Sequence, residues 1–260
     1  MTVDLFIMTY GADAVWTDYC LRSIRKYLTG FRDIVVGCPT NVPAVERSCA
    51  DFQARLFNFE HRDPGHMHQQ VLKMSADKFC RDGVDWIMFI DSDCIFTHPV
   101  TVESQFRRDR PIYCIDEWEA DHTYQWQEGT EKFVGWPIPY NFMRRHGMCF
   151  QPRHLRSVRQ HVESRHGEFE EAVMSCWDSD TEWFPARLDG RRWQPWGKPT
   201  LSEFCLMGSC VWKKFHREFC WWNVADFGWP GGDRYSFFKQ FWSHYDVQGD
   251  IRDELEAIVK

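Results

Sequence analysis

DWIMFIDSDCIF, residues 85–96, is the clearest structural signal in the chain. Its apolar run from Trp86 to Ile90 is short and preceded by turn residues, which is typical of a strand buried inside an α/β sheet. The run ends in Asp91-Ser92-Asp93, and open α/β sheets bind ligands beyond the carboxyl ends of their strands. Because residues two apart on a strand face the same side, Asp91 and Asp93 are expected to converge on one hard cation, Mg²⁺ or Mn²⁺.

The same Asp-Ser-Asp motif also fits a solvated turn that binds nothing, because turns are rich in aspartate and serine. Its position directly after a fully apolar strand favours the metal site. A cation held by two carboxylates is commonly shared with substrate phosphates. The expected ligand is therefore a nucleotide diphosphate.

Composition narrows the class of protein. The net charge of −7 gives no overall electrostatic attraction to nucleic acid or to an anionic membrane. The N-terminus lacks the basic segment of a signal peptide, and no apolar stretch reaches the length of a transmembrane helix. Eleven cysteines, an odd number without a CxxC pair, indicate reduced thiols rather than a zinc site or disulfides. We therefore expect a cytoplasmic protein without a membrane span.

The first half of the chain alternates strand and helix patterns, which is the order of a parallel, doubly wound sheet. Strands are expected at 3–9, 33–38 and 55–59, and helices at 14–28, 42–52 and 65–79. Lys73 lies in the last of these helices, where it is either a phosphate contact or an ordinary solvated lysine.

The second half is less regular. It is expected to contain a strand at 111–115, a long loop over the cleft at 116–135, a basic helical segment at 144–166, and helices at 199–215 and 250–259. Glu203 lies near the start of the 199–215 helix, where the macrodipole favours an ionised carboxylate.

Several motifs in this order resemble the GT-A glycosyltransferase superfamily, and more closely its short bacterial and viral members. They are LFIMTYGAD at 5–13, the pattern Gly65-x3-Gln69-Gln70-x2-Lys73, Asp91-Ser92-Asp93 followed by Pro99, GMCFQP at 147–152, and Ser202-Glu203-Phe204-x3-Gly208. The resemblance implies one Rossmann-like domain over 1–260 with a mostly parallel sheet flanked by helices. Residues 1–116 would bind the nucleotide-sugar, and the C-terminal elaboration, 117–260, would form the acceptor side.

The resemblance also implies transfer of a sugar from a nucleotide-diphosphate donor, with a UDP-sugar as the expected donor, using Mn²⁺ or Mg²⁺. Asp91 would contact the ribose or sugar and the metal, Asp93 would ligate the metal, and His244 would complete the metal site. Glu203, or in second place Asp180, would deprotonate the acceptor if the reaction inverts the anomeric centre. The remaining expected donor contacts are Thr9, Tyr10, Asp13, Gln69, Gln70 and Lys73.

The acceptor is expected to be a glycan, with hydroxymethylated DNA as the alternative. Arg153, Arg156 and Arg159, in the basic segment, would then contact DNA phosphates, and Trp193 would stack on an extruded base. The same arginines also fit a solvated helix face.

Two other classes of protein compete with this interpretation. A haloacid-dehalogenase-like phosphatase also has a strand that ends in DxD, but Ile95 stands where that motif usually has Thr or Val. A non-catalytic carbohydrate-binding module would explain the 14 tryptophans but not the ordered acidic motif. The sequence predicts no oligomeric state.

Overall fold

A mostly parallel sheet of five strands forms the centre of the molecule, in the order β10-β5-β1-β3-β4. The computed structural model describes residues 1–118, 124–143, 147–183, 196–230, 238–241 and 247–260. The strands of the central sheet are β1 (Val3–Met8), β3 (Asp33–Pro39), β4 (Arg55–Phe59), β5 (Trp86–Asp91) and β10 (Cys149–Phe150). β10 runs antiparallel to β5 and the other neighbouring strands are parallel.

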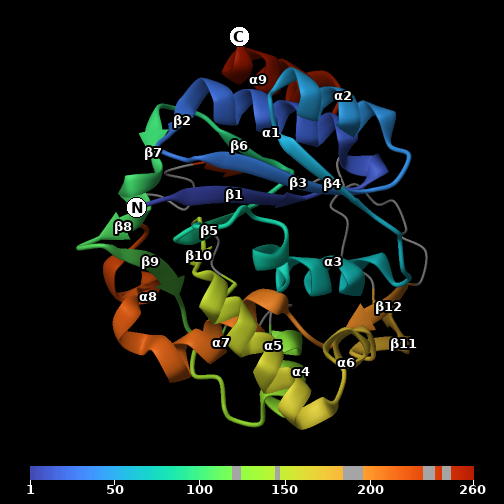
Figure 1. The fold of residues 1–260 in the computed structure, drawn as a ribbon, viewed down its shortest axis with the longest axis vertical. Helices are drawn as coiled ribbons and strands as arrows, with labels where there is room; N and C mark the ends of the chain where they lie inside the picture. Colours follow the sequence, from blue (N-terminus) through green and yellow to red (C-terminus); the bar gives the residue numbers. More distant parts are fainter. Residues whose placement is uncertain (119–123, 144–146, 184–195, 231–237, 242–246) are drawn as a thin grey trace.

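Helices cover both faces of this sheet. The larger helices are α1 (Ala14–Tyr27), α2 (Pro43–Asp51), α3 (Gly65–Lys73), α4 (Tyr124–Val134), α5 (Pro152–His166), α7 (Glu203–Phe215) and α9 (Gly249–Val259), with the short α6 (Phe169–Met174) and α8 (Val224–Phe227) between them. Figure 1 shows α1, α2 and α9 on one face and α3, α5 and α7 on the other. The predicted α/β fold with a mostly parallel sheet flanked by helices is thus confirmed.

The remaining strands form small sheets around this centre. They are β2 (Leu28–Thr29) with β7 (Val100–Thr101), β6 (Cys94–Phe96) with β14 (Phe238–Gln240), β11 (Trp177–Trp183) with β12 (Trp196–Pro199), and β13 (Cys220–Asn223) with β9 (Arg110–Ile115) and β8 (Phe106–Arg107). β6 follows directly after the acidic motif. Its antiparallel pairing with β14 brings the C-terminal part of the chain next to that motif.

β5 is buried over all its residues except Asp91, as predicted from its apolar run. It pairs in parallel with β1, with Val3 opposite Trp86 and Met8 opposite Asp91. This register places the acidic motif at the carboxyl edge of the sheet.

The segment 116–135, expected to be a loop, contains α4, so that expectation was wrong for residues 124–134. The helix packs on α7 and the segment before it. Gly129 makes the close approach possible, because a Cβ there would lie 1.8 Å from the carbonyl oxygen of Thr200. The face of α4 that packs on the protein consists of Trp126, Thr130 and Val134. Thr130 is polar and interrupts the apolar pattern that would identify a helix in the sequence.

Two predicted helices are shorter than expected. The helix predicted at 65–79 ends at Lys73, where the carbonyl oxygen of Met74 accepts a hydrogen bond from Arg159 Nη1 at 2.6 Å. The helix predicted at 199–215 begins at Glu203 because the side chain of Ser202 caps it, accepting from the backbone N–H of Cys205.

Buried apolar side chains from Val3 to Leu255 form one core cluster that includes both halves of the chain. All eleven cysteines are described, and none forms a disulfide. Among the described residues, no helix has the length and apolar character needed to cross a membrane.

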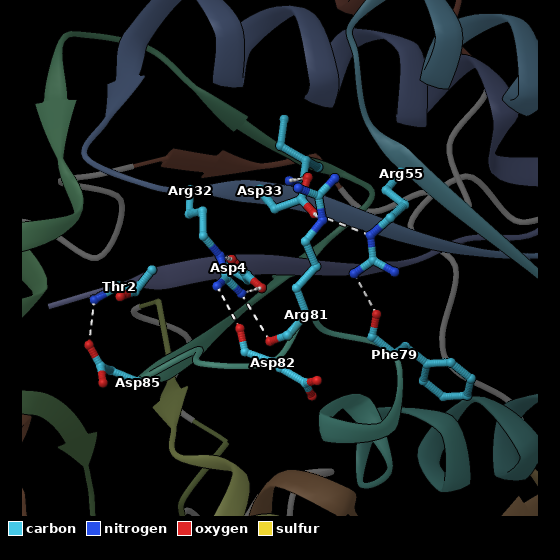
Figure 2. A network of polar contacts seen from close by, with 10 residues as sticks. Thr2, Asp4, Arg32, Asp33, Arg55, Phe79, Arg81, Asp82 and Asp85 are labelled. Atoms are coloured by element: carbon cyan, nitrogen blue, oxygen red, sulfur yellow. Dashed lines mark hydrogen bonds and ion pairs between the residues drawn. The ribbon is translucent and has the colours of Figure 1, made fainter.

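A polar network stabilises the amino-terminal edge of the sheet, opposite the acidic motif (Figure 2). The fully buried Asp4 of β1 accepts two hydrogen bonds from the guanidinium of Arg32, at 2.8 and 2.6 Å. Arg32 also donates to the backbone carbonyl oxygens of Arg81 and Asp82, in the loop that precedes β5. The network therefore holds that loop against β1 and fixes where β5 enters the sheet.

Replacing Arg32 with Met should destabilise the protein, because the charge of Asp4 would remain buried without its partner. We expect the free energy of unfolding to fall by about 3 kcal/mol. The control is Arg22→Met, which breaks the more exposed pair with Asp18 and should cost less than about 1 kcal/mol. Denaturant unfolding of both variants measures the difference, and equal losses would contradict the assignment.

A second buried polar group lies at the start of α5. His154 is fully buried among aromatic rings, its Nδ1 accepts from the backbone N–H of Gln151, and its Nε2 lies 2.9 Å from Glu218 Oε2. Burial lowers the pKa of His154 from 6.5 to about 4, although Glu218 opposes this shift. The imidazole is therefore neutral in the folded protein at neutral pH.

This histidine should make stability depend on pH. Between pH 6.5 and about 4 the unfolded chain takes up a proton at His154 that the folded protein does not, so stability is lost as pH falls through this range. The contribution approaches about 1.4 kcal/mol per pH unit. Urea unfolding at several pH values should show a shallower dependence for His154→Leu than for the wild type, and parallel curves would refute the assignment.

Candidate functional site

A cleft of about 280 Å³ opens at the carboxyl edge of the parallel sheet. Met8 and Asp91, which end β1 and β5 and lie opposite each other in the register, both line it. The lining residues that sequence analysis predicted are Asp13, Gln69, Gln70, Lys73, Asp91, Asp93 and Glu203. Residues far apart in the chain thus meet where ligands bind in open α/β sheets.

The acidic motif turns out of β5 into the cleft. Asp91 is the last residue of β5, Ser92 and Asp93 form the turn, and β6 follows. Both aspartates line the cleft, as expected, but Asp93 reaches it from the turn rather than by the alternation of a strand, and Ser92 lines the cleft too. Asp93 is 7% exposed, and Gln240 Nε2 lies 3.2 and 3.4 Å from its two carboxylate oxygens.

Gln240 was missed by sequence analysis. It reaches Asp93 because β14 pairs with β6 and places Gln240 opposite Cys94. β14 has only three residues, too few for a recognisable strand pattern. Its pairing also joins segments about 150 residues apart, so the sequence gives no signal for this contact. Gln240 orients the carboxylate of Asp93, which is the usual role of an outer hydrogen-bond partner at a metal site.

Lys73 connects the two sides of the cleft. Its Nζ lies 3.0 Å from Asp91 Oδ1 and 3.0 Å from Glu203 Oε1, and its side chain is 7% exposed. Burial alone would lower the pKa of Lys73, but the two carboxylates raise it above its ordinary value through charge and hydrogen bonding. The ammonium is therefore charged and already neutralised by protein groups, so the phosphate contact expected of Lys73 is not supported.

Glu203 is the first residue of α7, as predicted, and its side chain is 10% exposed. Its carboxylate lies at the helix N-terminus and accepts a hydrogen bond from the ammonium of Lys73 at 3.0 Å. α7 packs tightly at this end of the molecule: a Cβ on Gly208 would lie 2.5 Å from the side chain of Phe142. Helix packing therefore fixes the direction from which Glu203 enters the cleft.

α3 supplies another wall of the cleft through His66, Gln69 and Gln70. Gln70 is anchored by its Nε2, which donates to the carbonyl oxygen of Leu201 at 3.1 Å. His66 was not predicted. It stays accessible to water, yet the surrounding protein atoms lower its pKa by desolvation, with Glu203 acting in the opposite direction.

Two polar atoms of the cleft lining are buried without a hydrogen-bond partner within the described part of the chain. They are Gln70 Oε1, an acceptor, and Trp126 Nε1, a donor. Both side chains flank the segment before Glu203. Gln70 donates to the carbonyl oxygen of Leu201. Thr130, which lies one turn after Trp126 on α4, accepts from the N–H of Ser202. Buried polar atoms in folded proteins nearly always have partners, so these two atoms are exceptions, as are Gln105 Oε1 and Asn141 Nδ2 away from the cleft lining.

Two predicted donor contacts lie outside the cleft. Thr9 is fully buried, with its Oγ1 2.6 Å from the Oγ1 of Thr17. The hydroxyl of Tyr10 donates to the carbonyl oxygen of Gly65 at 2.9 Å. These side chains support α1 and α3 rather than line the cleft.

Three further predictions cannot be placed. His244 and Trp193 lie outside the described residues, and so does the side chain of Asp180, whose backbone belongs to β11.

The three arginines expected to contact DNA are paired with carboxylates. Arg153 Nη2 lies 2.5 Å from Glu218 Oε2, and Arg159, 8% exposed, binds Asp77 with both terminal nitrogens. Arg156 also approaches Asp77, at 3.8 Å. The stripe Leu155, Val158 and Val162 is buried, as predicted. α5 therefore presents arginines engaged in ion pairs, and none of the three lines the cleft.

The oxygen atoms of Asp91 and Asp93 suit a hard divalent cation, and both residues face the same cleft. Within the described residues, no group of three or more His, Cys, Asp or Glu side chains forms a complete ligand set. Two of the three expected ligands, Asp91 and Asp93, thus lie in the cleft and offer oxygen atoms to a cation. The third, His244, lies outside the described residues.

No model of a known protein family matches the chain, and no curated protein sequence matches it either. The residues of the cleft are therefore the basis for a functional proposal.

Proposed function

We propose that the protein is a metal-dependent glycosyltransferase with a GT-A type of fold, which moves a sugar from a nucleotide-diphosphate donor, a UDP-sugar, to an acceptor hydroxyl. The observation that carries the proposal is the convergence of Asp91, Asp93 and Glu203 on one cleft at the carboxyl edge of a parallel sheet. A glycan is the proposed acceptor, because the arginines of α5 are engaged with carboxylates and give no support to DNA.

The charge of the cleft supports a reaction that needs a cation. Among its described lining residues, four carboxylates face one lysine, which leaves a formal charge of −3 with His66 neutral. A divalent cation would offset the repulsion between these carboxylates and a diphosphate. Mn²⁺ or Mg²⁺ held by Asp91 and Asp93 would neutralise the departing diphosphate.

The remaining side chains have roles that follow from their places. Asp13 and Gln69 line the cleft next to the carboxyl end of β1 and would contact the nucleotide-sugar. Glu203 would accept the proton of the attacking hydroxyl in an inverting reaction and would bind the acceptor in a retaining one.

Gln70 and Trp126 support a sugar as the transferred group. An acceptor and a donor, both without partners in the described chain, line the same cleft. A hydroxyl group both donates and accepts, so the hydroxyl groups of a sugar suit an acceptor such as Gln70 Oε1 and a donor such as Trp126 Nε1.

The proposal is tested by incubating the purified protein with a panel of nucleotide-sugars and Mn²⁺, alone and with glycan or hydroxymethylated DNA acceptors. We expect hydrolysis or transfer that EDTA abolishes. Hydrolysis of p-nitrophenyl phosphate without any turnover of nucleotide-sugars would instead identify a phosphatase. Absence of both activities, with carbohydrate binding retained, would identify a binding module.

Asp93→Asn should abolish the metal-dependent turnover while leaving the fold intact, because it removes a charged ligand and keeps the side-chain shape. We expect a loss of about 100-fold or more in the hydrolysis of the best nucleotide-sugar. Asp226→Asn, a change at an exposed acid that does not line the cleft, should have no effect. Wild-type turnover by Asp93→Asn at ordinary Mn²⁺ concentrations would remove the central claim.

Trp126→Phe should weaken the use of the sugar substrate by about 3- to 10-fold in kcat/KM, the size of one neutral hydrogen bond. It should alter stability little, because the deleted N–H has no partner in the described chain. Trp118→Phe is the matched control: its Nε1 donates to the carbonyl oxygen of Ile138 at 3.0 Å, so stability should fall and kcat/KM should not. The reverse pattern would exclude a ligand role for Trp126.

A further inference from the structure

Three neighbouring side chains contact the ammonium of Lys73. Two carboxylate oxygens lie 3.0 Å from Nζ, one from Asp91 and one from Glu203. The ring of Phe204 lies on a further side, with its centroid 4.8 Å from Nζ. Two carboxylates and an aromatic ring therefore engage the ammonium.

These contacts join three elements of the fold. Lys73 ends α3, Asp91 ends β5, and Glu203 and Phe204 begin α7. Lys73 therefore fixes the distance between the carboxylate at the proposed cation site and the carboxylate at the proposed acceptor site. It is also the sole cationic lysine or arginine among the described residues that line the cleft.

We propose that Lys73 is a built-in counter-cation that keeps a divalent cation from binding strongly at Asp91 until a nucleotide diphosphate arrives. This inference rests on the proposed function. A cation bound to Asp91 would lie close to the ammonium, and like charges at such separations repel strongly where water is partly excluded. A diphosphate brings several negative charges of its own, which offset the repulsion, so cation and nucleotide bind together.

The same arrangement makes Lys73 a positioning residue for Glu203. Without the ammonium, the repulsion between the carboxylates of Asp91 and Glu203 would increase, and a divalent cation would be drawn between them. The free protein would then hold the cation in a place that does not serve the transfer of a sugar.

The test measures Mn²⁺ binding to the full chain by electron paramagnetic resonance of free Mn²⁺, with and without UDP. The wild type should bind Mn²⁺ weakly alone and at least about 10-fold more tightly with UDP. Lys73→Met should bind Mn²⁺ alone at least about 10-fold more tightly than the wild type, with a smaller effect of UDP. Lys78→Met, which removes an exposed lysine close by in the chain, should behave like the wild type.

A second variant protects the test against misfolding. Lys73→Met combined with Glu203→Gln keeps the formal charge of the cleft at −3, because one positive and one negative charge are removed together. It should still bind Mn²⁺ more tightly than the wild type, since Asp91 has lost its competing ammonium. Affinity equal to or below that of the wild type in the folded variants would overturn the inference, and so would tight Mn²⁺ binding by the wild type without UDP.

The outcomes separate this inference from the proposed function. If the wild type binds no Mn²⁺ even with UDP, the proposed function fails and the inference fails with it. If UDP does promote Mn²⁺ binding in the wild type but Lys73→Met binds Mn²⁺ alone no better, Lys73 is not the counter-cation, and the metal-dependent function stands.

Discussion

The parallel pairing of β5 with β1 is the constraint on which the rest of the structure depends. Both strands are buried along almost their whole length, and the register ends with Met8 opposite Asp91. Both faces of these strands are covered, so a slip of one residue would bring side chains of the wrong size into a closely packed core. The pairing therefore fixes where the chain leaves the sheet, and with it the position of the acidic motif.

The two edges of the sheet use charge in opposite ways. At the amino-terminal edge, Asp4 is fully matched by Arg32, and the pair closes the loop before β5. At the carboxyl edge, carboxylates outnumber cations among the described lining residues, and two polar atoms remain unsatisfied. The buried pair at the first edge stabilises the fold, whereas the carboxylates at the second edge face a cleft.

Local patterns in the sequence were sufficient for much of the fold and part of the site. The apolar run of β5, the strand and helix alternation, and Glu203 at the start of a helix were all predicted, because each depends on neighbours in the chain. The contacts of Lys73 and Gln240 were not predictable in this way. Their partners are 18 to about 150 residues away, and the burial of Lys73 exists only because α3, β5 and α7 meet.

The close contact of Gly129 with the carbonyl oxygen of Thr200 affects the size of the cleft. Trp126 lines the cleft because α4 can pack against this segment, and the absence of a side chain at position 129 permits that approach. A larger residue at position 129 would push α4 away from this segment and would move Trp126 with it, although no lining residue would have changed. The capacity of the cleft is thus encoded partly in a residue that does not line it.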